Sequence, residues 1–268
     1  MKFKLYEEFP NEESLSKLDY IDFPIDLVLA AKSLDEFENL ENKVKKGNVE
    51  NVVYWPLLSK EEGYWPNVFS KKTALMRVIN EINKSKRNLE IVWDCEFGFE
   101  RNESGNIVIG DTVKFKDNKE LIRNFLKNRN RNIEITTVEI PNYLFGDSLL
   151  GVFGLAFDPL EYYTKKNKMV YSSLRKYAEK YIPKISLDEK YYELFKRELR
   201  NGVNKFGDKF SISLGCLSNG IIGNEPLMNM GELERELTIA KEEEINEVYL
   251  FRLNGINKEY SEVMKKFV

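Results

Sequence analysis

The sequence predicts an α/β protein, a single (β/α)8 barrel of the TIM type that spans residues 1–268. Short β-branched or aromatic runs alternate with amphipathic helical stretches from end to end, which is the order that βαβ units produce. Eight such pairs can be counted, and 268 residues is the usual length of one barrel domain. The segment after the first run, Glu7–Pro10, lacks the glycine-rich phosphate loop that an open doubly wound sheet favours.

The expected strands are mostly apolar runs, as parallel strands that are buried on both faces should be. Three lysines close to the sixth run, Lys165, Lys166 and Lys168, are expected to belong to a surface loop. The eight expected strands are Phe3–Glu8, Asp26–Ala31, Asn51–Leu57, Leu89–Phe97, Ile133–Ile140, Lys168–Ser173, Phe210–Leu217 and Glu247–Leu253.

The helix with the clearest start and stop signals in the sequence follows the second strand. Ser33 and Glu36 form a capping box at its start, and Gly47 is expected to close it in a left-handed conformation. Another helix is expected to start at Ser70, whose side chain can accept the free amides of the first turn. Further helices are expected over Glu232–Glu244 and Lys258–Phe267, and between Leu174 and Val203 on the two sides of Pro183.

Charge and apolar content argue against two classes of partner. The formal net charge is only −3, from 41 basic and 44 acidic residues, so no long-range field would gather nucleic acid. The longest apolar stretch, Tyr143–Phe157, contains Asp147 and is shorter than the roughly 20 residues that cross a bilayer. We therefore expect neither a nucleic-acid partner nor a membrane span.

The cysteine and histidine content limits the cellular location and the classes of catalysis that we expect for this chain. Only Cys95 and Cys216 are present, and the first residues contain no apolar export signal, so a reducing cytoplasm is the expected location. The absence of histidine excludes Ser-His-Asp and Cys-His hydrolases and His-ligated zinc. Acid–base chemistry in this chain must use carboxylates, Tyr, Lys, Cys or water.

Candidate catalytic residues lie where strands end, because the active sites of TIM barrels form at the carboxyl ends of their strands. Asp94 and Glu96 are two residues apart on the fourth strand, so they share a face and lie roughly 7 Å apart. Glu139 ends the fifth strand next to them, and Pro141 then stops the ladder. If Glu96 and Glu139 face each other, they form a retaining pair at about 5.5 Å or an inverting pair at a larger separation.

Candidate substrate-binding residues surround these acids. Tyr54 and Trp55 come from the third strand and Trp65 from the loop after it, and aromatic rings beside acids suit a sugar ring. Arg252 and Asn254 end the eighth strand, and a buried Arg252 requires either a carboxylate of the fourth or fifth strand or an anionic group of the substrate. Each candidate also has a structural interpretation, namely ion pairing or helix capping for the acids and core packing for the tryptophans.

Two short motifs resemble those of the substrate-assisted, chitinase-like glycosidases. Asp94-Cys95-Glu96 on the fourth strand resembles the end of a DxxDxDxE signature, and Met169-Val170-Tyr171 on the sixth resembles MxYD or MxYN. The resemblance implies a (β/α)8 barrel in which Glu96 is the general acid, Asp94 orients the substrate acetamide and Tyr171 supports the intermediate.

The resemblance is incomplete. Leu89 and Val92 occupy the first two acidic positions of the signature, and Ser172 replaces the Asp or Asn after Tyr171. Arg252 and Leu253 stand where the family has a tryptophan on the eighth strand.

The sequence therefore supports three functional hypotheses. The leading one is a carbohydrate-active barrel, a glycoside hydrolase that acts on a small-molecule or glycan substrate without a cofactor. In the second, Asp94, Glu96 and Glu139 bind Mg2+ or Mn2+, and Arg252 receives a phosphorylated or carboxylated small molecule. In the third, a non-catalytic barrel binds a glycan or a protein through its aromatic third-strand loop and the stretch Tyr143–Phe157.

Overall fold

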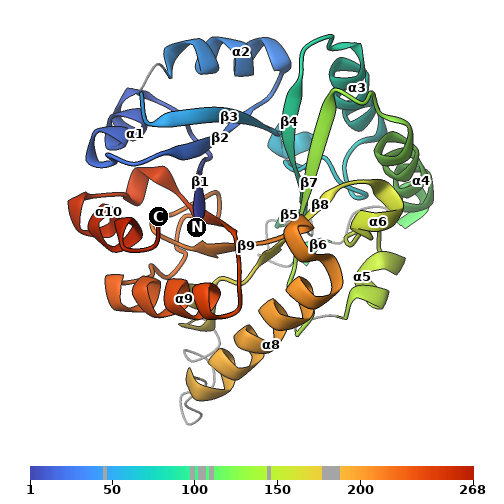
Figure 1. The fold of residues 1–268 in the computed structure, drawn as a ribbon. Coiled ribbons are helices and arrows are strands. Elements are labelled where there is room, and N and C mark those ends of the chain that lie inside the picture. The colour runs from blue at the N-terminus through green and yellow to red at the C-terminus, as the bar shows by residue number, and fades with distance from the viewer. Residues whose placement is uncertain (45–46, 97–99, 102–106, 109–111, 144–145, 177–187) are drawn as a thin grey trace. The chain divides into compact units, whose positions relative to one another are not determined.

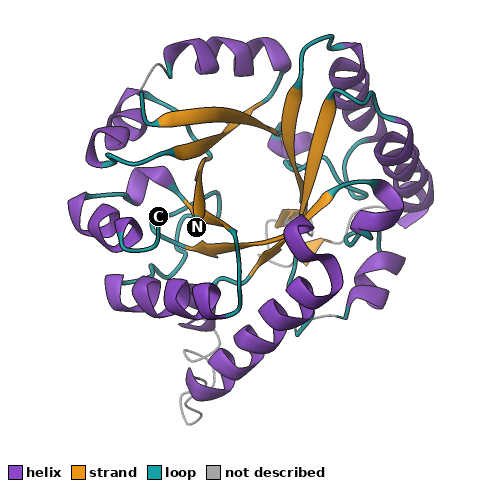
Figure 2. Cartoon of the chain, viewed as in Figure 1, coloured by secondary structure: helices purple, strands orange, loops and turns teal. Residues whose placement is uncertain are grey.

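The computed structural model describes residues 1–44, 47–96, 100–101, 107–108, 112–143, 146–176 and 188–268. Eight strands close into a barrel in the order β1-β10-β9-β8-β7-β4-β3-β2, and helices alternate with them along the chain (Figures 1 and 2). This is the predicted (β/α)8 fold. The barrel strands are β1 Lys2–Glu7, β2 Ile25–Ala31, β3 Val49–Pro56, β4 Leu89–Cys95, β7 Ile133–Glu139, β8 Lys165–Met169, β9 Phe210–Gly215 and β10 Glu247–Phe251.

Smaller elements complete the described part of the chain. The two-residue strands β5 (Glu100–Arg101) and β6 (Ile107–Val108) form an antiparallel pair. The helices are α1 Glu12–Ser16, α2 Leu34–Lys43, α3 Lys72–Lys84, α4 Thr112–Asn128, α5 Asp147–Val152, α6 Pro159–Tyr162, α8 Asp188–Phe206, α9 Met230–Glu242 and α10 Lys258–Lys265. Short 3-10 turns include η3 Ser172–Leu174 and η5 Leu253–Gly255.

The predicted strands overlap all eight barrel strands, and the largest difference is at β8. This strand begins at Lys165, three residues before the predicted start, so the expectation of a surface loop around Lys166 and Lys168 is wrong. Lys166 is 2% exposed and Lys168 is 1% exposed. Lysine tolerates such burial when an acid partners it, and Lys166 has one in Glu139, 27 positions away in the chain.

Of two predicted helix starts, the one at α2 is confirmed and the one at α3 is not. At α2, Ser33 accepts the amide of Glu36 as predicted, and the helix ends at Lys43, before Gly47. At α3, however, Ser70 is not the cap. The helix starts at Lys72, and the hydroxyl of Ser70 instead donates to the carbonyl of Trp65. The expected break at Pro183 lies outside the described residues.

The chain divides into two compact units that interleave in sequence. Unit 1 comprises Met1–Leu29, Glu41–Val52 and Lys168–Val268, and unit 2 comprises Ala30–Leu40 and Val53–Asn167. The single domain over residues 1–268 stays a prediction.

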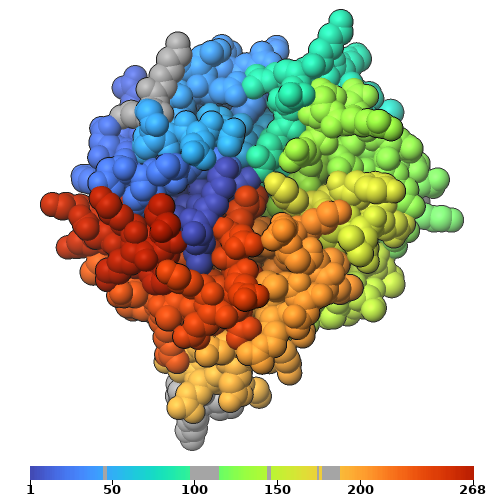
Figure 3. Space-filling view, viewed as in Figure 1, coloured from blue at the N-terminus to red at the C-terminus, as the bar shows by residue number. Residues whose placement is uncertain are grey.

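Unit 1 contains the strand pairs β1–β2, β1–β10 and β9–β10. At the amino end of β1, Lys4 is 1% exposed and its ammonium lies 3.4 Å from Asp26 and 3.3 Å from Glu247. The two ends of the chain also meet here, because the amino-terminal ammonium donates to the carbonyl of Phe267. Figure 3 shows the dark blue start of the chain beside its red end. This end of unit 1 is held by ion pairs and hydrogen bonds between distant segments.

Helix α8 packs closely against β9 at a glycine. A Cβ on Gly202 would lie 2.2 Å from Cζ of Phe210, whose ring is buried. We expect Gly202→Ala to destabilise the protein by about 2 kcal/mol, because overpacking costs more than the helix propensity of alanine returns. Urea unfolding monitored by circular dichroism measures the change. Asn201→Ala, on the exposed side of the same turn, is the matched control and should be neutral or slightly stabilising. A Gly202→Ala protein as stable as the parent would contradict this packing.

Unit 2 is organised around the fully paired strands β4 and β7. Their register aligns Leu89 with Ile133 and continues without a bulge to Cys95 and Glu139. The Trp93 ring packs 5.3 Å from that of Phe125 in α4, so this face of β4 is covered by helices. Successive strand residues alternate between the two faces, and the residues on either side of Trp93 therefore point away from α4.

Candidate functional site

Asp94 and Glu96 form the candidate site at the carboxyl end of β4. Alternation places Asp94 on the face of β4 opposite to Trp93, and continuing it by one residue places Glu96 on the same face. Asp94 is 3% exposed and Glu96 is half-buried. The side-chain amide of Asn67 donates to the carbonyl of Glu96 at 2.8 Å, which fixes the backbone at the strand end. Unit 2 thus holds two neighbouring carboxyl groups in different environments at the end where barrels carry their active sites.

Glu139 does not join this pair. The register aligns Glu139 with Cys95 rather than with Asp94, so its side chain lies on the other face of the sheet. It is fully buried, and Oε2 lies 2.8 Å from the ammonium of Lys166. Its other oxygen, Oε1, accepts the amide of Phe157 at 2.9 Å. Glu139 therefore does not form the pair with Glu96 that was considered as one possibility, and it ties β7 to β8 and to the segment that leads into α6.

The predicted aromatic platforms are core residues in this structure. Tyr54 is fully buried, with its ring 4.9 Å from that of Phe37 in α2. Burial, helped by the charges of Glu81 and Glu36, raises the pKa of the Tyr54 hydroxyl above its usual range. Tyr54 therefore lies under α2, where its burial supports a packing role, and its contact with a substrate stays a prediction.

The two tryptophans are also covered. Trp55 is 4% exposed and Trp65 is 5% exposed, and the Trp65 ring makes an edge contact with Tyr64 at 5.1 Å. Both rings bury nearly all of their surface, and their contact with a sugar stays a prediction. Their packing role, which the sequence left as an alternative, is the one that their burial supports.

Tyr171 belongs to unit 1, where it follows β8. Its ring is half-buried and lies 6.1 Å from that of Phe251 at the end of β10. Val170, the residue before Tyr171, is held by hydrogen bonds of its backbone. Its amide donates to the carbonyl of Ser213, and its carbonyl accepts a hydrogen bond from the Tyr191 hydroxyl. Tyr171 is thus placed at the carboxyl end of its strand, as predicted from the MxY motif.

Arg252 has the carboxylate partner that its burial requires, but that partner comes from the first strand. Its guanidinium lies 3.2 Å from Glu7 and donates to the carbonyl of Asn219 at 2.8 Å. Glu7 also accepts the amide of Asn254 at 3.0 Å. Burial raises the pKa of the Glu7 carboxyl, and Arg252 opposes that rise. Arg252 and Asn254 therefore join β10 to β1 through Glu7, an acid that was not among the partners expected from the sequence, which were an acid of the fourth or fifth strand or an anionic group of the substrate.

One acid at a strand end was missed by the sequence analysis. Glu8 is 4% exposed and follows β1 in the alternation that includes Lys4 and Tyr6. A Cβ on Gly220 would lie 2.8 Å from Oε2 of Glu8 and 2.7 Å from Cζ of Phe251, so the acid lies beside an aromatic ring. The alternation of Lys4, Tyr6 and Glu8 was the signal that could have identified it.

The predicted interaction stretch is partly exposed. Within it, Leu150, Leu155 and Phe157 are buried, whereas Leu149 is 49% exposed and Val152 is 60% exposed. Residues 144–145 of the stretch lie outside the described part of the chain. The exposed side of α5 is a small apolar surface, and the buried side anchors it.

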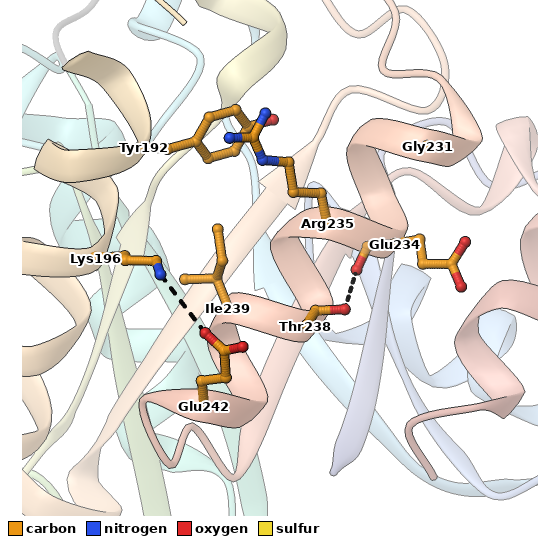
Figure 4. Close-up of a pocket in the computed structure, with 8 residues that line it drawn as sticks. All are labelled: Tyr192, Lys196, Gly231, Glu234, Arg235, Thr238, Ile239 and Glu242. Carbon is orange, nitrogen blue, oxygen red and sulfur yellow. Dashed lines mark hydrogen bonds and ion pairs between the residues drawn. The ribbon is translucent and has the colours of Figure 1, made fainter. Parts of the chain in front are cut away.

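Other potential sites are limited in the part of the chain that the structure describes. Within the described ranges, no three Asp, Glu, Cys or His residues are placed so that they could hold a metal ion. None of the helices there combines the length and apolar character needed to cross a membrane. An open groove of about 470 Å3 runs between α8 and α9, where Arg235 stacks on Tyr192 and Lys196 pairs with Glu242 (Figure 4). This groove lies in the helix layer, and its Glu234 pairs with Lys266 outside the lining.

Comparisons with known proteins agree with the fold. The sequence matches no protein-family model and no curated protein. The glycoside hydrolase domain of PgaB (BpsB) from Bordetella bronchiseptica is similar in structure, with a TM-score of 0.60 and 9% identity over 99% of this chain and 98% of that chain. The spore cortex-lytic enzyme SleL from Bacillus cereus gives 0.53 and 10%, over 99% and 74% of the two chains. A chitinase from Chromobacterium violaceum gives 0.50 and 9%, over 99% and 98%. The chain is thus a TIM barrel whose fold resembles that of glycoside hydrolases.

Proposed function

We propose that this protein is a carbohydrate-active barrel that hydrolyses glycosidic bonds. The observation that carries the proposal is the placement of Asp94 and Glu96 at the carboxyl end of β4, on the face turned away from α4. A glycosidase needs a proton donor beside a second acid and needs neither histidine nor a metal. The resemblance of the fold to glycoside hydrolases supports the same class.

The two acids have different roles in this proposal. Glu96 is half-buried, and it protonates the glycosidic oxygen as the bond to the anomeric carbon breaks. Asp94 is 3% exposed, and it orients the 2-acetamido group whose oxygen attacks that carbon from the opposite side. Water then opens the resulting ring, and Glu96 accepts the proton of that water. The substrate class is therefore a chain or small glycoside that contains 2-acetamido sugars.

Glu139 has no catalytic role in this proposal because its carboxylate is bound to Lys166 on the other face of the sheet. The same placement removes the third ligand from the metal-dependent hypothesis. Tyr54, Trp55 and Trp65 support the fold around β3.

The test compares 2-acetamido with 2-hydroxy glycosides as substrates. We expect release of reducing ends from the 2-acetamido series only, and a loss of about 100-fold in kcat for Asp94→Asn, because a misoriented nucleophile costs about that much. Asp117→Asn is the control, since the Asp117 side chain is exposed on α4 and pairs with Lys72. Equal turnover of both series, or full activity of Asp94→Asn, would contradict the assigned role. A chain that releases no reducing ends from any glycan would favour the non-catalytic alternative.

A further inference from the structure

A buried carboxyl group lies outside the proposed site, on α9. Glu236 is fully buried in unit 1. Among the described residues, neither of its oxygens has a hydrogen-bond partner of ordinary geometry. Its side chain interacts with the Ser172 hydroxyl of η3, which is also fully buried. Burying an unpaired carboxylate is costly, so this position favours an uncharged acid.

The charged groups around Glu236 are already paired with one another. Arg175 lies 2.6 Å from Asp188 and 3.4 Å from Glu232, and Lys176 lies 2.8 Å from Glu232. These are two cations and two acids, so among the residues that the structure describes these two cations already have acid partners other than Glu236. Tyr192 of α8, which also faces Glu236, supplies no positive charge.

The segment that contacts Glu236 is the one that carries Tyr171. The Ser173 hydroxyl accepts the amide of Cys216 at 2.8 Å, and Lys176 donates to the carbonyl of Leu227. Glu236 is the buried acid behind this segment, next to Ser172. A charge that appears on Glu236 must therefore be hydrated, and hydration requires that the segment move away from α9.

We propose that Glu236 is a positioning residue, a proton-operated latch that holds residues 171–176 against α9 when it is uncharged and releases them when it ionises. Ionisation removes the proton from the carboxyl group to solvent, and no other bond changes. The latch depends on the geometry of unit 1 and not on the proposed hydrolytic function.

The pH range of the latch follows from the burial. Burial raises the pKa of Glu236 from 4.5 to about 8, and the Ser172 hydroxyl opposes that rise. Because the folded state favours the protonated acid, the stabilisation is complete below pH 4.5 and is lost as the pH rises through about 8. The closed segment therefore loses stability progressively as the pH rises from about 4.5 to about 8, and above about 8 no further loss is expected because Glu236 is charged in both states.

Hydrogen exchange of the peptide that covers residues 170–176, measured from pH 6 to pH 9.5 and corrected for the intrinsic rate, tests the latch. We expect protection in the parent protein to fall by roughly tenfold per pH unit from pH 6 to about 8 and to level off above that pH, because opening releases one proton only while the closed state is protonated. Glu236→Gln is neutral and of the same size, so its protection should not change with pH. Glu234→Gln is the matched control, since Glu234 is exposed on the same helix and pairs with Lys266.

The same pH dependence in the parent and in Glu236→Gln would overturn the proposal, and so would a constant protection in the parent. Neither result requires catalytic activity, so failure of the latch is distinguishable from failure of the proposed function. If both proposals hold, turnover falls in parallel with protection between pH 6 and about 8 in the parent and not in Glu236→Gln.

Discussion

Turnover should fall by about 10²- to 10⁴-fold when Glu96 is replaced by Gln, because the amide cannot protonate the leaving oxygen. The substitution keeps the size and the polar character of the side chain at a half-buried position, so the fold should be unchanged. Steady-state kinetics on a 2-acetamido glycoside measures the loss. A glycoside with an activated phenol as leaving group should recover part of the rate, because it needs less protonation.

The matched control for Glu96 is Glu90→Gln. Glu90 is also half-buried and lies on the same face of β4, at its amino end, where barrels carry stability and not chemistry. We expect Glu90→Gln to retain parental kinetics. If Glu96→Gln stays fully active, or if both variants lose activity equally, Glu96 is not the general acid.

Breaking the buried pair between Glu139 and Lys166 should have the largest effect on stability. Lys166→Met leaves the carboxylate of Glu139 without its cation in a site that is 0% exposed. Removal of one partner of a buried ion pair costs about 3–5 kcal/mol, and most of that cost is the uncompensated charge. Urea unfolding monitored by circular dichroism measures the change in the free energy of unfolding.

Two further variants separate the ion pair from simple packing. Lys165→Met changes the neighbouring, 39% exposed lysine, whose contact with Glu134 is 3.8 Å, and should change stability by less than about 1 kcal/mol. The double variant Glu139→Gln, Lys166→Met removes the buried charge and should recover part of the loss. If the Lys166→Met protein is as stable as the parent, the ion pair between Lys166 and Glu139 does not contribute to stability in solution.

The strand pattern and the barrel were predictable from the sequence because both depend on local features. Runs such as Leu89–Trp93 contain the apolar side chains that parallel strands require, and they repeat at the spacing of βαβ units. The start of β8 was not predictable in the same way. Its lysines have the composition of a surface loop, and only the buried acid Glu139 on β7 makes their burial favourable.

The burial of Arg252 was predictable from the sequence, but its partner was not. The apolar residues before Arg252 show that it is buried, and burial requires an anionic partner, but they do not identify it. Glu7 is 245 positions away and becomes the partner because β1 pairs with β10 when unit 1 folds.

The sequence by itself determined that Asp94 and Glu96 share one face of a strand end, because alternation along one strand is local geometry. Only the tertiary structure decided that Glu139 lies on the other face, since the register between β4 and β7 depends on how two strands align. It likewise decided that Tyr54 lies beneath α2 and that Glu236 is buried beside Ser172, because burial is set by segments that are distant in the chain.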